Sequence, residues 1–312
     1  MLKRLSRTGL LAGLVVLFVV GALLSPAFLS VPNQLNILRQ AAFVGIIACG
    51  MTYVILAGEI DISVGSLVAL SSALLGVMMT KLGYPLPVAI LAVLVVGMVS
   101  GLLTGLARVF FGVPSFISTL ALYLALRGLA QIITGSLPIV IDNPVLRFFG
   151  NGRMAGIPVQ VIILLAVFAI AFFVSRKTTF GRSIYAIGGN AKAARLAGIP
   201  VDRVRILIFV ITGVLAAFVG ILLSARLEAG NANIATGLEF EVIAAVIVGG
   251  TSLAGGHGGI AGTFLGVLFI TVLSNILVLL GVDPFAQDVV RGAIVLLAVL
   301  IANIQTGETR KD

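Results

Sequence analysis

Long apolar segments alternate with short polar ones along the whole chain. A helix that crosses the hydrocarbon core of a bilayer needs roughly 20 predominantly apolar residues. The segments fall near residues 9–29, 38–57, 62–80, 86–107, 114–134, 157–175, 204–226, 239–254, 260–280 and 287–304. This pattern predicts an all-α integral membrane protein of about ten transmembrane helices in a single domain, residues 1–312. The eighth segment is short, and the sequence leaves open whether it is a full span or a half-helix.

The composition supports a membrane protein. Hydrophobic residues make up 60% of the chain and charged residues 10%, whereas a soluble domain carries about 25% charged residues. The first apolar segment follows Lys3, Arg4 and Arg7 and continues to about Leu29. A secretory signal peptide has a shorter apolar region, of about 7–15 residues. We therefore expect a retained first helix rather than a cleaved leader.

The basic residues predict an orientation in the membrane. The formal net charge is +9, and Lys and Arg gather near both termini and in the segment 176–203. Cytoplasmic loops carry an excess of these residues, and an even number of helices puts both termini on one side. Both termini and segment 176–203 are therefore predicted to be cytoplasmic. Because this topology accounts for the positive charge, no nucleic-acid binding is predicted.

Segment 176–203, between the sixth and seventh spans, has a helical pattern of its own. Asn190 can cap a helix, and residues 191–197 are good helix formers. Gly198 can end that helix, and Pro200 prevents its continuation. We expect a short cytoplasmic helix here; the alternative is a basic loop that only fixes the topology.

Several kinds of chemistry are missing from the sequence. No Gly-Lys pair occurs, so the chain has no phosphate-binding P-loop. Any ATP hydrolysis must then take place on another chain, and no catalytic residue is predicted. Cys49 and His257 are the only residues of their types, which excludes a thiolate cluster and a multi-histidine metal site. We therefore expect this chain to bind no metal and no cofactor.

Two carboxylates interrupt the apolar pattern between the second and third spans. Glu59 and Asp61 lie beside glycines, and a charge near the bilayer interior is costly unless it is paired or hydrated. Asp61 can cap the third helix through the free amide of Ser63 or Val64. A role in gating or coupling and a role in proton binding are the alternatives.

Other polar residues lie within or beside spans. Arg127 lies mid-span and is expected to face the bundle interior, beside a cavity or an acidic partner. Glu239 and Glu241 are expected at the outer end of the eighth segment. They either line an outer vestibule, bind a docking partner, or form a solvated helix start. Asn275 and Gln131 can hydrogen-bond a hydroxylated substrate or join two helices. The candidates for the pathway or its gate are Glu59, Asp61, Ser63, Arg127 and Asn275.

Three stretches of the sequence resemble a known family. They are GMTYVILAGEIDISVGSLVALSSA from residue 50, GRSIYAIGGNAKAARLAGI from residue 181 and AAVIVGGTSLAGGHGGIAGTFLGVL from residue 244. In their order and spacing they are similar to the ribose-type sugar permeases of bacterial ABC importers, and the resemblance covers essentially the whole chain.

Residues 192–198 match the cytoplasmic Glu-Ala-Ala-x-x-x-Gly motif with which such permeases dock on the ATPase, and Lys192 replaces the usual glutamate. The resemblance implies coupling to the ATPase through Gly181, Gly189, Asn190, Lys192, Ala193, Ala194, Arg195 and Gly198.

The resemblance also implies a function and partners. The function is import of a monosaccharide (a pentose, a hexose or a related sugar) across the bacterial inner membrane. The partners are an ATP-binding subunit, expected to contain two fused modules that hold ATP and Mg²⁺, and a second permease chain, identical or not. A periplasmic or lipid-anchored sugar-binding protein is expected to dock outside, with Glu239 and Glu241 as its candidate contacts. The rival hypotheses are an ion-coupled secondary transporter, a purely structural subunit, and a related permease for a nucleoside or a branched-chain amino acid.

Overall fold

The computed structural model describes residues 2–283 and positions 285–287, 289–290, 292–293, 296 and 300, with side chains from residue 9 onward. The predicted tenth segment, 287–304, lies largely outside the described residues, as does the C-terminus. The helices are α1 Leu2–Leu24, α2 Val31–Leu56, α3 Val64–Gly76 with its π-helical extension η1 Val77–Lys81, α4 Leu86–Phe110, α5 Ser115–Thr134, α6 Pro144–Asn151, α7 Val159–Lys177, α8 Thr179–Leu196, α9 Val201–Leu227, α10 Leu238–Val248 and α11 Ile260–Leu279.

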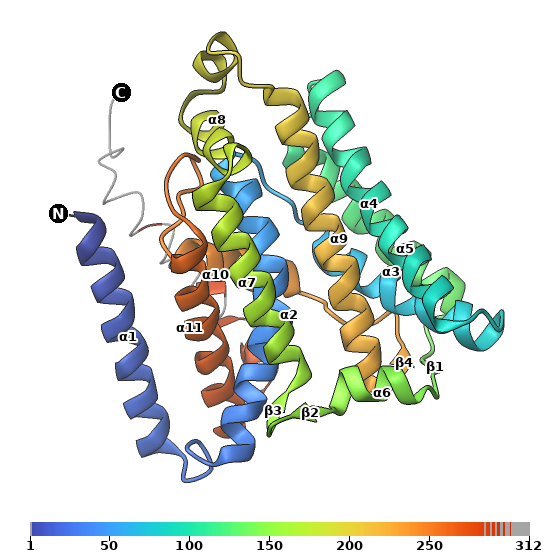
Figure 1. The fold of residues 1–312 in the computed structure, drawn as a ribbon. Coiled ribbons are helices and arrows are strands. Elements are labelled where there is room, and N and C mark those ends of the chain that lie inside the picture. Colours follow the sequence, from blue (N-terminus) through green and yellow to red (C-terminus); the bar gives the residue numbers. More distant parts are fainter. Residues whose placement is uncertain are drawn as a thin grey trace.

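Four two-residue strands complete the fold. They form the antiparallel pairs β1 (Ile139–Val140) with β4 (Ala229–Gly230) and β2 (Arg153–Met154) with β3 (Ile157–Pro158). The strands and α6 lie at one end of the bundle, and α8 lies at the other (Figure 1). We call these the α6 end and the α8 end.

The part of the chain that the structure describes has seven helices long and apolar enough to cross a membrane: α2, α3 with η1, α4, α5, α7, α9 and α11. The apolar part of α1, Gly9–Leu24, is shorter. Helix α2 begins at Val31, earlier than the apolar pattern predicted, because Pro32 suits the first turn of a helix. An all-helical membrane protein is confirmed, and the total of about ten spans stays a prediction.

Helix α2 forms the centre of the bundle. All of its residues from 41 to 56 are buried, and it packs against α7, α9, α10 and α11. Helices α4 and α9 approach closely because both carry glycines. A side chain at Gly101 would overlap the backbone of Phe209. Small residues bring helices together in this way in membrane proteins, where the hydrophobic effect between helices is weak.

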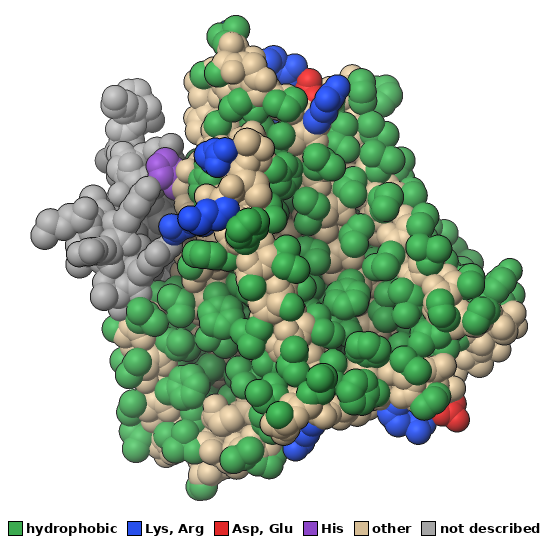
Figure 2. Space-filling model, in the orientation of Figure 1, with side chains coloured by type: hydrophobic (Ala, Val, Ile, Leu, Met, Phe, Trp, Pro, Cys, Tyr) green, Lys and Arg blue, Asp and Glu red, His purple; other side chains and the backbone are tan. Residues whose placement is uncertain are grey.

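The outer surfaces of the bundle are apolar. Leu91 on α4, Ile132 on α5 and Phe173 on α7 are 64%, 77% and 60% exposed. Figure 2 shows hydrophobic side chains over the middle of one face, with Lys and Arg side chains toward its two ends. A continuous apolar surface of this extent marks contact with lipid or protein, so the protein is integral to a membrane.

The eighth apolar segment forms only half a span as a helix. Helix α10 has 11 residues, about 16 Å in length, against a hydrocarbon core of about 30 Å. Before it, residues 231–237 run in irregular conformation beside α3. The Asn231 amide donates to the Ser72 hydroxyl at 3.0 Å, halfway along α3, and Glu239 packs on Gly65 near its start. The half-helix alternative is therefore correct.

Candidate functional site

The three stretches that carried the resemblance meet at the α8 end. The Gly256 amide donates to the Leu56 carbonyl, the last residue of α2, at 2.9 Å. Gly188 of α8 lies so close that a β-carbon there would overlap that carbonyl and the Gly256 amide. Gly255, with φ +86°, lies against both Gly58 and Gly188. We call Leu56, Gly58, Gly188, Gly255 and Gly256 the glycine junction; it joins α8, α2 and the loop before α11 (Figure 1).

A buried ion cluster lies beside the junction. Glu59 is 3% exposed, and both of its carboxylate oxygens accept hydrogen bonds from Arg108 Nε at 2.9 Å. Arg205 Nε lies 3.1 Å from Glu59 Oε1, as an ion pair without hydrogen-bond geometry. Arg108 is near the end of α4 and Arg205 near the start of α9. The Glu59 cluster therefore ties the connection after α2 to two further helices.

Asp61 stabilises the turn before α3. It is 2% exposed, and its Oδ1 accepts hydrogen bonds from the Ser63 amide at 2.9 Å and the Ser63 hydroxyl at 2.6 Å. The predicted bond to the Ser63 amide is thus present, but it closes the turn before the helix and does not cap it, because Ser63 itself occupies the cap position. The Ile60 and Ile62 amides donate to hydroxyls of α5, so the whole connection between α2 and α3 is held in place.

Helix α8 consists of two helical parts with a break at Asn190. That residue has extended backbone angles (φ −163°, ψ 100°), and its side-chain oxygen accepts the Ala193 amide at 2.9 Å. The second part ends where Gly198 adopts φ +80° and the Ile199 amide donates to the Ala194 carbonyl. The structure thus has the predicted short helix with the predicted cap and end. We call it the short helix 191–197.

One of the residues predicted for coupling, Ala194, does not lie on the exposed side of the short helix. Ala194 is buried at 5% exposure, whereas Lys192, Ala193 and Arg195 are exposed and Leu196 is 84% exposed. Arg195 pairs with Asp202 at 2.5 Å, and this hydrogen bond raises the pKa of the Arg195 guanidinium. Leu196 thus projects away from the bundle among basic residues.

The two other glycines predicted for coupling differ in their surroundings. A β-carbon at Gly181 would overlap the backbone at Val174 and Ser175, so this glycine lets α8 fold back on α7. Gly189 has open space around it.

Arg127 and Glu239 lie inside the bundle, away from the junction. Arg127 Nη1 donates to the carbonyls of Ala232 and Ile234 at 2.9 and 2.7 Å. Glu239 is 0% exposed, and neither carboxylate oxygen has a hydrogen-bond partner among the described residues. The sequence placed Glu239 at the outer rim, but its side chain is buried against Gly65 near the start of α3, so this carboxylate presents no surface to a docking protein. Glu241, two residues on, is partly buried.

Asn275 joins two helices. Its side-chain amide exchanges two hydrogen bonds, of 3.0 and 2.9 Å, with the amide of Asn33 on α2. Of the two roles predicted for Asn275, the structure supports the contact between helices.

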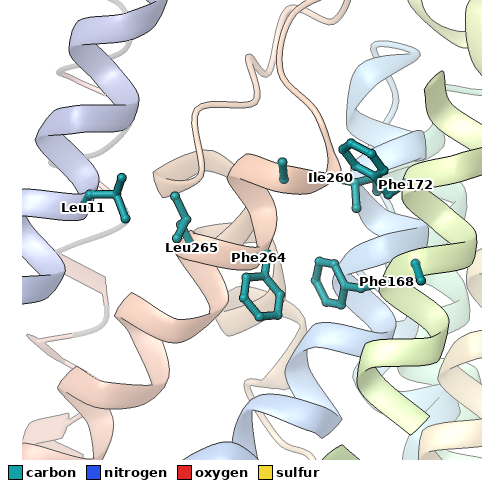
Figure 3. Close-up of a pocket in the computed structure, with 8 residues that line it drawn as sticks. Leu11, Phe168, Phe172, Ile260, Phe264 and Leu265 are labelled. Carbon is teal, nitrogen blue, oxygen red and sulfur yellow. The ribbon is translucent and has the colours of Figure 1, made fainter. Parts of the chain in front are cut away.

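A pocket of about 450 Å³ opens between α1, α7 and α11 (Figure 3). Its lining is Leu11, Phe168, Ala169, Phe172, Ile260, Ala261, Phe264 and Leu265. None of these side chains can hydrogen-bond a hydroxyl group, so the pocket suits an acyl chain rather than a sugar. Among the residues that the structure describes, no group of three or more His, Cys, Asp or Glu could hold a metal ion.

Sequence reasoning missed Arg108, Arg205, Gly188 and Leu196. Neither arginine was predicted as a partner of Glu59, although a buried carboxylate requires a counter-charge. No sequence pattern marks Gly188 or Leu196 as a functional residue. Their roles depend on which side of α8 faces the bundle.

Comparison with known proteins defines the family. Residues 33–299 match the model of the branched-chain amino acid transport system permease component. The chain is 52% identical to the probable ABC transporter permease protein YphD of Escherichia coli K12, over 97% of this chain and 90% of the relative. It is 44% identical to the ribose import permease protein RbsC of Bacillus subtilis (95% and 92%) and 35% identical to the xylose transport system permease protein XylH of Haemophilus influenzae (88% and 90%).

The chain belongs to the ribose-type ABC sugar permease family. No solved structure gives a significant match. Proteins of this family are transport components rather than enzymes, which agrees with the missing P-loop. The glycine junction of this permease is formed by the three stretches that carried the resemblance.

The Glu59 cluster gives a prediction for stability. Replacing Glu59 with Gln leaves two neighbouring guanidiniums without their carboxylate. Because Arg108 and Arg205 are 27% and 17% exposed, we expect a loss of about 2 kcal/mol, below the full cost of breaking a deeply buried pair. The free energy of unfolding of the purified permease in detergent measures this loss.

A matched control is Asp142→Asn, because Asp142 also pairs with an arginine but is 82% exposed. An exposed ion pair contributes little, so this variant should unfold like the parent. Equal stability of the two variants would show that the Glu59 cluster does not hold the helices together.

Proposed function

We propose that this permease is the transmembrane subunit of an ATP-binding cassette importer that moves a monosaccharide into the cytoplasm, driven by ATP hydrolysis on a separate subunit. The observation that carries the proposal is the glycine junction. It connects the first part of α8, which leads through the break at Asn190 into the exposed short helix, to the central helix α2 and to the loop before α11. The names of the relatives, ribose and xylose permeases, support a sugar as the substrate.

The proposed orientation has the α8 end in the cytoplasm of a bacterial cell, with the permease crossing the inner membrane about ten times and both termini inside. The basic residues support it: Arg108, Arg176, Lys177, Arg182, Lys192, Arg195, Arg203 and Arg205 lie at or near the α8 end. Short loops with this excess of Lys and Arg stay on the cytoplasmic side.

The ATPase subunit, with its ATP and Mg²⁺, then docks on the short helix 191–197. Lys192, Ala193 and Leu196 offer the contact surface, while Ala194 holds the helix against the permease. Movement of the ATPase modules passes through the glycine junction to α2 and the loop before α11. The Glu59 cluster extends the moving unit to α4 and α9. Packed helices that share such contacts shift as a rigid body.

The α6 end faces the sugar-binding protein in this arrangement. Arg147 forms ion pairs with Asp142 at 2.8 Å and Glu228 at 3.1 Å, and all three side chains are 40% exposed or more. Hydrogen bonding to Glu228 raises the pKa of Arg147. These exposed charges suit docking better than the buried Glu239. A second permease chain, identical or not, completes the pathway.

Two rival functions fit the geometry less well. An ion-coupled transporter needs a carboxylate within the membrane to bind the ion. Glu59 and Asp61 are already held by arginines and by Ser63, which leaves Glu239 as the one described carboxylate that is buried without a hydrogen-bond partner. Transport of branched-chain amino acids is named in the description of the family, but the relatives at 35% to 44% identity carry the names of sugars.

Uptake by the reconstituted complex tests the function. The permease is placed in vesicles with its candidate ATPase subunit and binding protein, and labelled ribose and xylose are supplied on the side of the binding protein. We expect uptake of at least one sugar that requires ATP. Uptake that continues without ATP and follows a proton gradient would instead establish a secondary transporter.

The docking surface can be tested at Leu196. Leu196→Glu places a charge at an apolar, 84% exposed contact, so it should abolish co-purification of the ATPase subunit while the permease keeps its thermal stability. Leu137→Glu, at a 69% exposed leucine beside β1, is the control and should retain the ATPase. Retention of the ATPase by both variants would remove the short helix from the interface.

A further inference from the structure

The irregular segment 231–237 lies deep in the bundle. It begins after β4 and follows α3 from Ser72 toward Gly65. Arg127, in the middle of α5, donates to two of its carbonyls, those of Ala232 and Ile234. Segment 231–237 therefore runs from beside the end of α5, where Asn233 donates to the Ser136 carbonyl, inward along α3 to the level of Gly65.

Backbone that is not helical has unpaired amide and carbonyl groups. Within the hydrocarbon region it is tolerated only where protein buries it or where it lines a water-filled cavity. Here one side is buried: the Asn231 amide bonds to Ser72, and Arg127 satisfies two carbonyls. The other side is open, since Asn233 and Thr236 are exposed.

The open side is lined by polar side chains. Gln131 of α5 donates to Asn233 Oδ1 at 3.5 Å, and Asn233 donates to the Ser136 carbonyl at 2.9 Å. Gln131, Asn233 and Thr236 are exposed, and Asn231 is partly exposed. We call these four residues the amide face. Lipid offers no partner for an amide, and such exposure in hydrocarbon would cost several kcal/mol for each group.

We propose that the amide face lines the aqueous pathway and hydrogen-bonds the hydroxyl groups of the passing sugar. This inference rests on the proposed function for the identity of the solute. A side-chain amide both donates and accepts hydrogen bonds, as a sugar hydroxyl does. Three amides and one hydroxyl therefore match an uncharged polyol, and no charged side chain belongs to the set.

Arg127 behind the amide face holds it in position. Its guanidinium fixes the backbone of segment 231–237 through the carbonyls of Ala232 and Ile234. Helix α10 starts directly after segment 231–237, so the half-helix and the amide face are continuous in the chain. Half-helices that end near the middle of the membrane form solute sites in many transporters.

Cysteine accessibility in the assembled importer tests the proposal. The natural Cys49 is buried, so single substitutions can be read against the unmodified chain. Asn233→Cys and Thr236→Cys should react with a membrane-impermeant methanethiosulfonate reagent. The control is Leu129→Cys, at similar depth on the opposite side of α5 from Gln131 and 48% exposed. The reagent attacks thiolates, which form in water and not in lipid, so we expect rates at least about tenfold above the control.

Rates equal to the control at both positions would overturn the proposal, because the amide face would then be sealed by lipid or by the partner chain.

Labelled ribose uptake by the parent importer is measured in parallel. Fast labelling without ATP-driven uptake of any sugar would contradict the proposed function but leave the aqueous surface established. With uptake intact in the parent, Asn233→Leu should reduce it at least about tenfold, as expected for the loss of hydrogen bonds in a site built to make them. Normal uptake by this variant would exclude contact with the sugar.

Discussion

The backbone contact between Leu56, Gly188 and Gly256 determines how the parts of this permease are connected. Three segments far apart in the sequence touch there without intervening side chains. Only glycine permits such an approach at Gly188, because any β-carbon would overlap a carbonyl and an amide. Contacts of this kind transmit displacement with little loss, since close-packed backbone has no soft side chains to absorb it. The other features of the α8 end follow from this contact.

The charged groups are arranged around that constraint. Glu59 directly follows the glycine junction and pairs with Arg108 and Arg205. Asp61 stabilises the turn before α3. Burying a carboxylate is costly, and the two arginines offset most of that cost. The Glu59 cluster thus connects α4 and α9 to the same point as α8 and the loop before α11. Deeper in the bundle, Arg127 holds the carbonyls of Ala232 and Ile234, and this contact supports the amide face rather than the α8 end.

Much of this arrangement could be predicted from the sequence. Apolar segments of membrane-spanning length predicted the long helices. Asn190 and Gly198 predicted the start and the end of the short helix. Both predictions succeed because they depend only on neighbouring residues in the sequence. The position of Glu239 could not be predicted, since an apolar run does not reveal that an irregular segment precedes it inside the bundle. Likewise, the burial of Ala194 and the exposure of Leu196 depend on how α8 is rotated against its neighbours. Arg108 and Arg205 become partners of Glu59 only in three dimensions.

Replacement of Gly188 and Gly189 by alanine tests the central claim most directly. Alanine is the better helix former by about 1 kcal/mol, so helix propensity cannot account for a loss of function. ATP-driven sugar uptake is measured for each variant in complexes that retain the ATPase subunit. The account predicts that Gly188→Ala loses uptake while still binding the ATPase, because a β-carbon opens the junction. Gly189→Ala, in open space, should transport like the parent. Normal uptake by the Gly188→Ala complex would contradict coupling through the glycine junction.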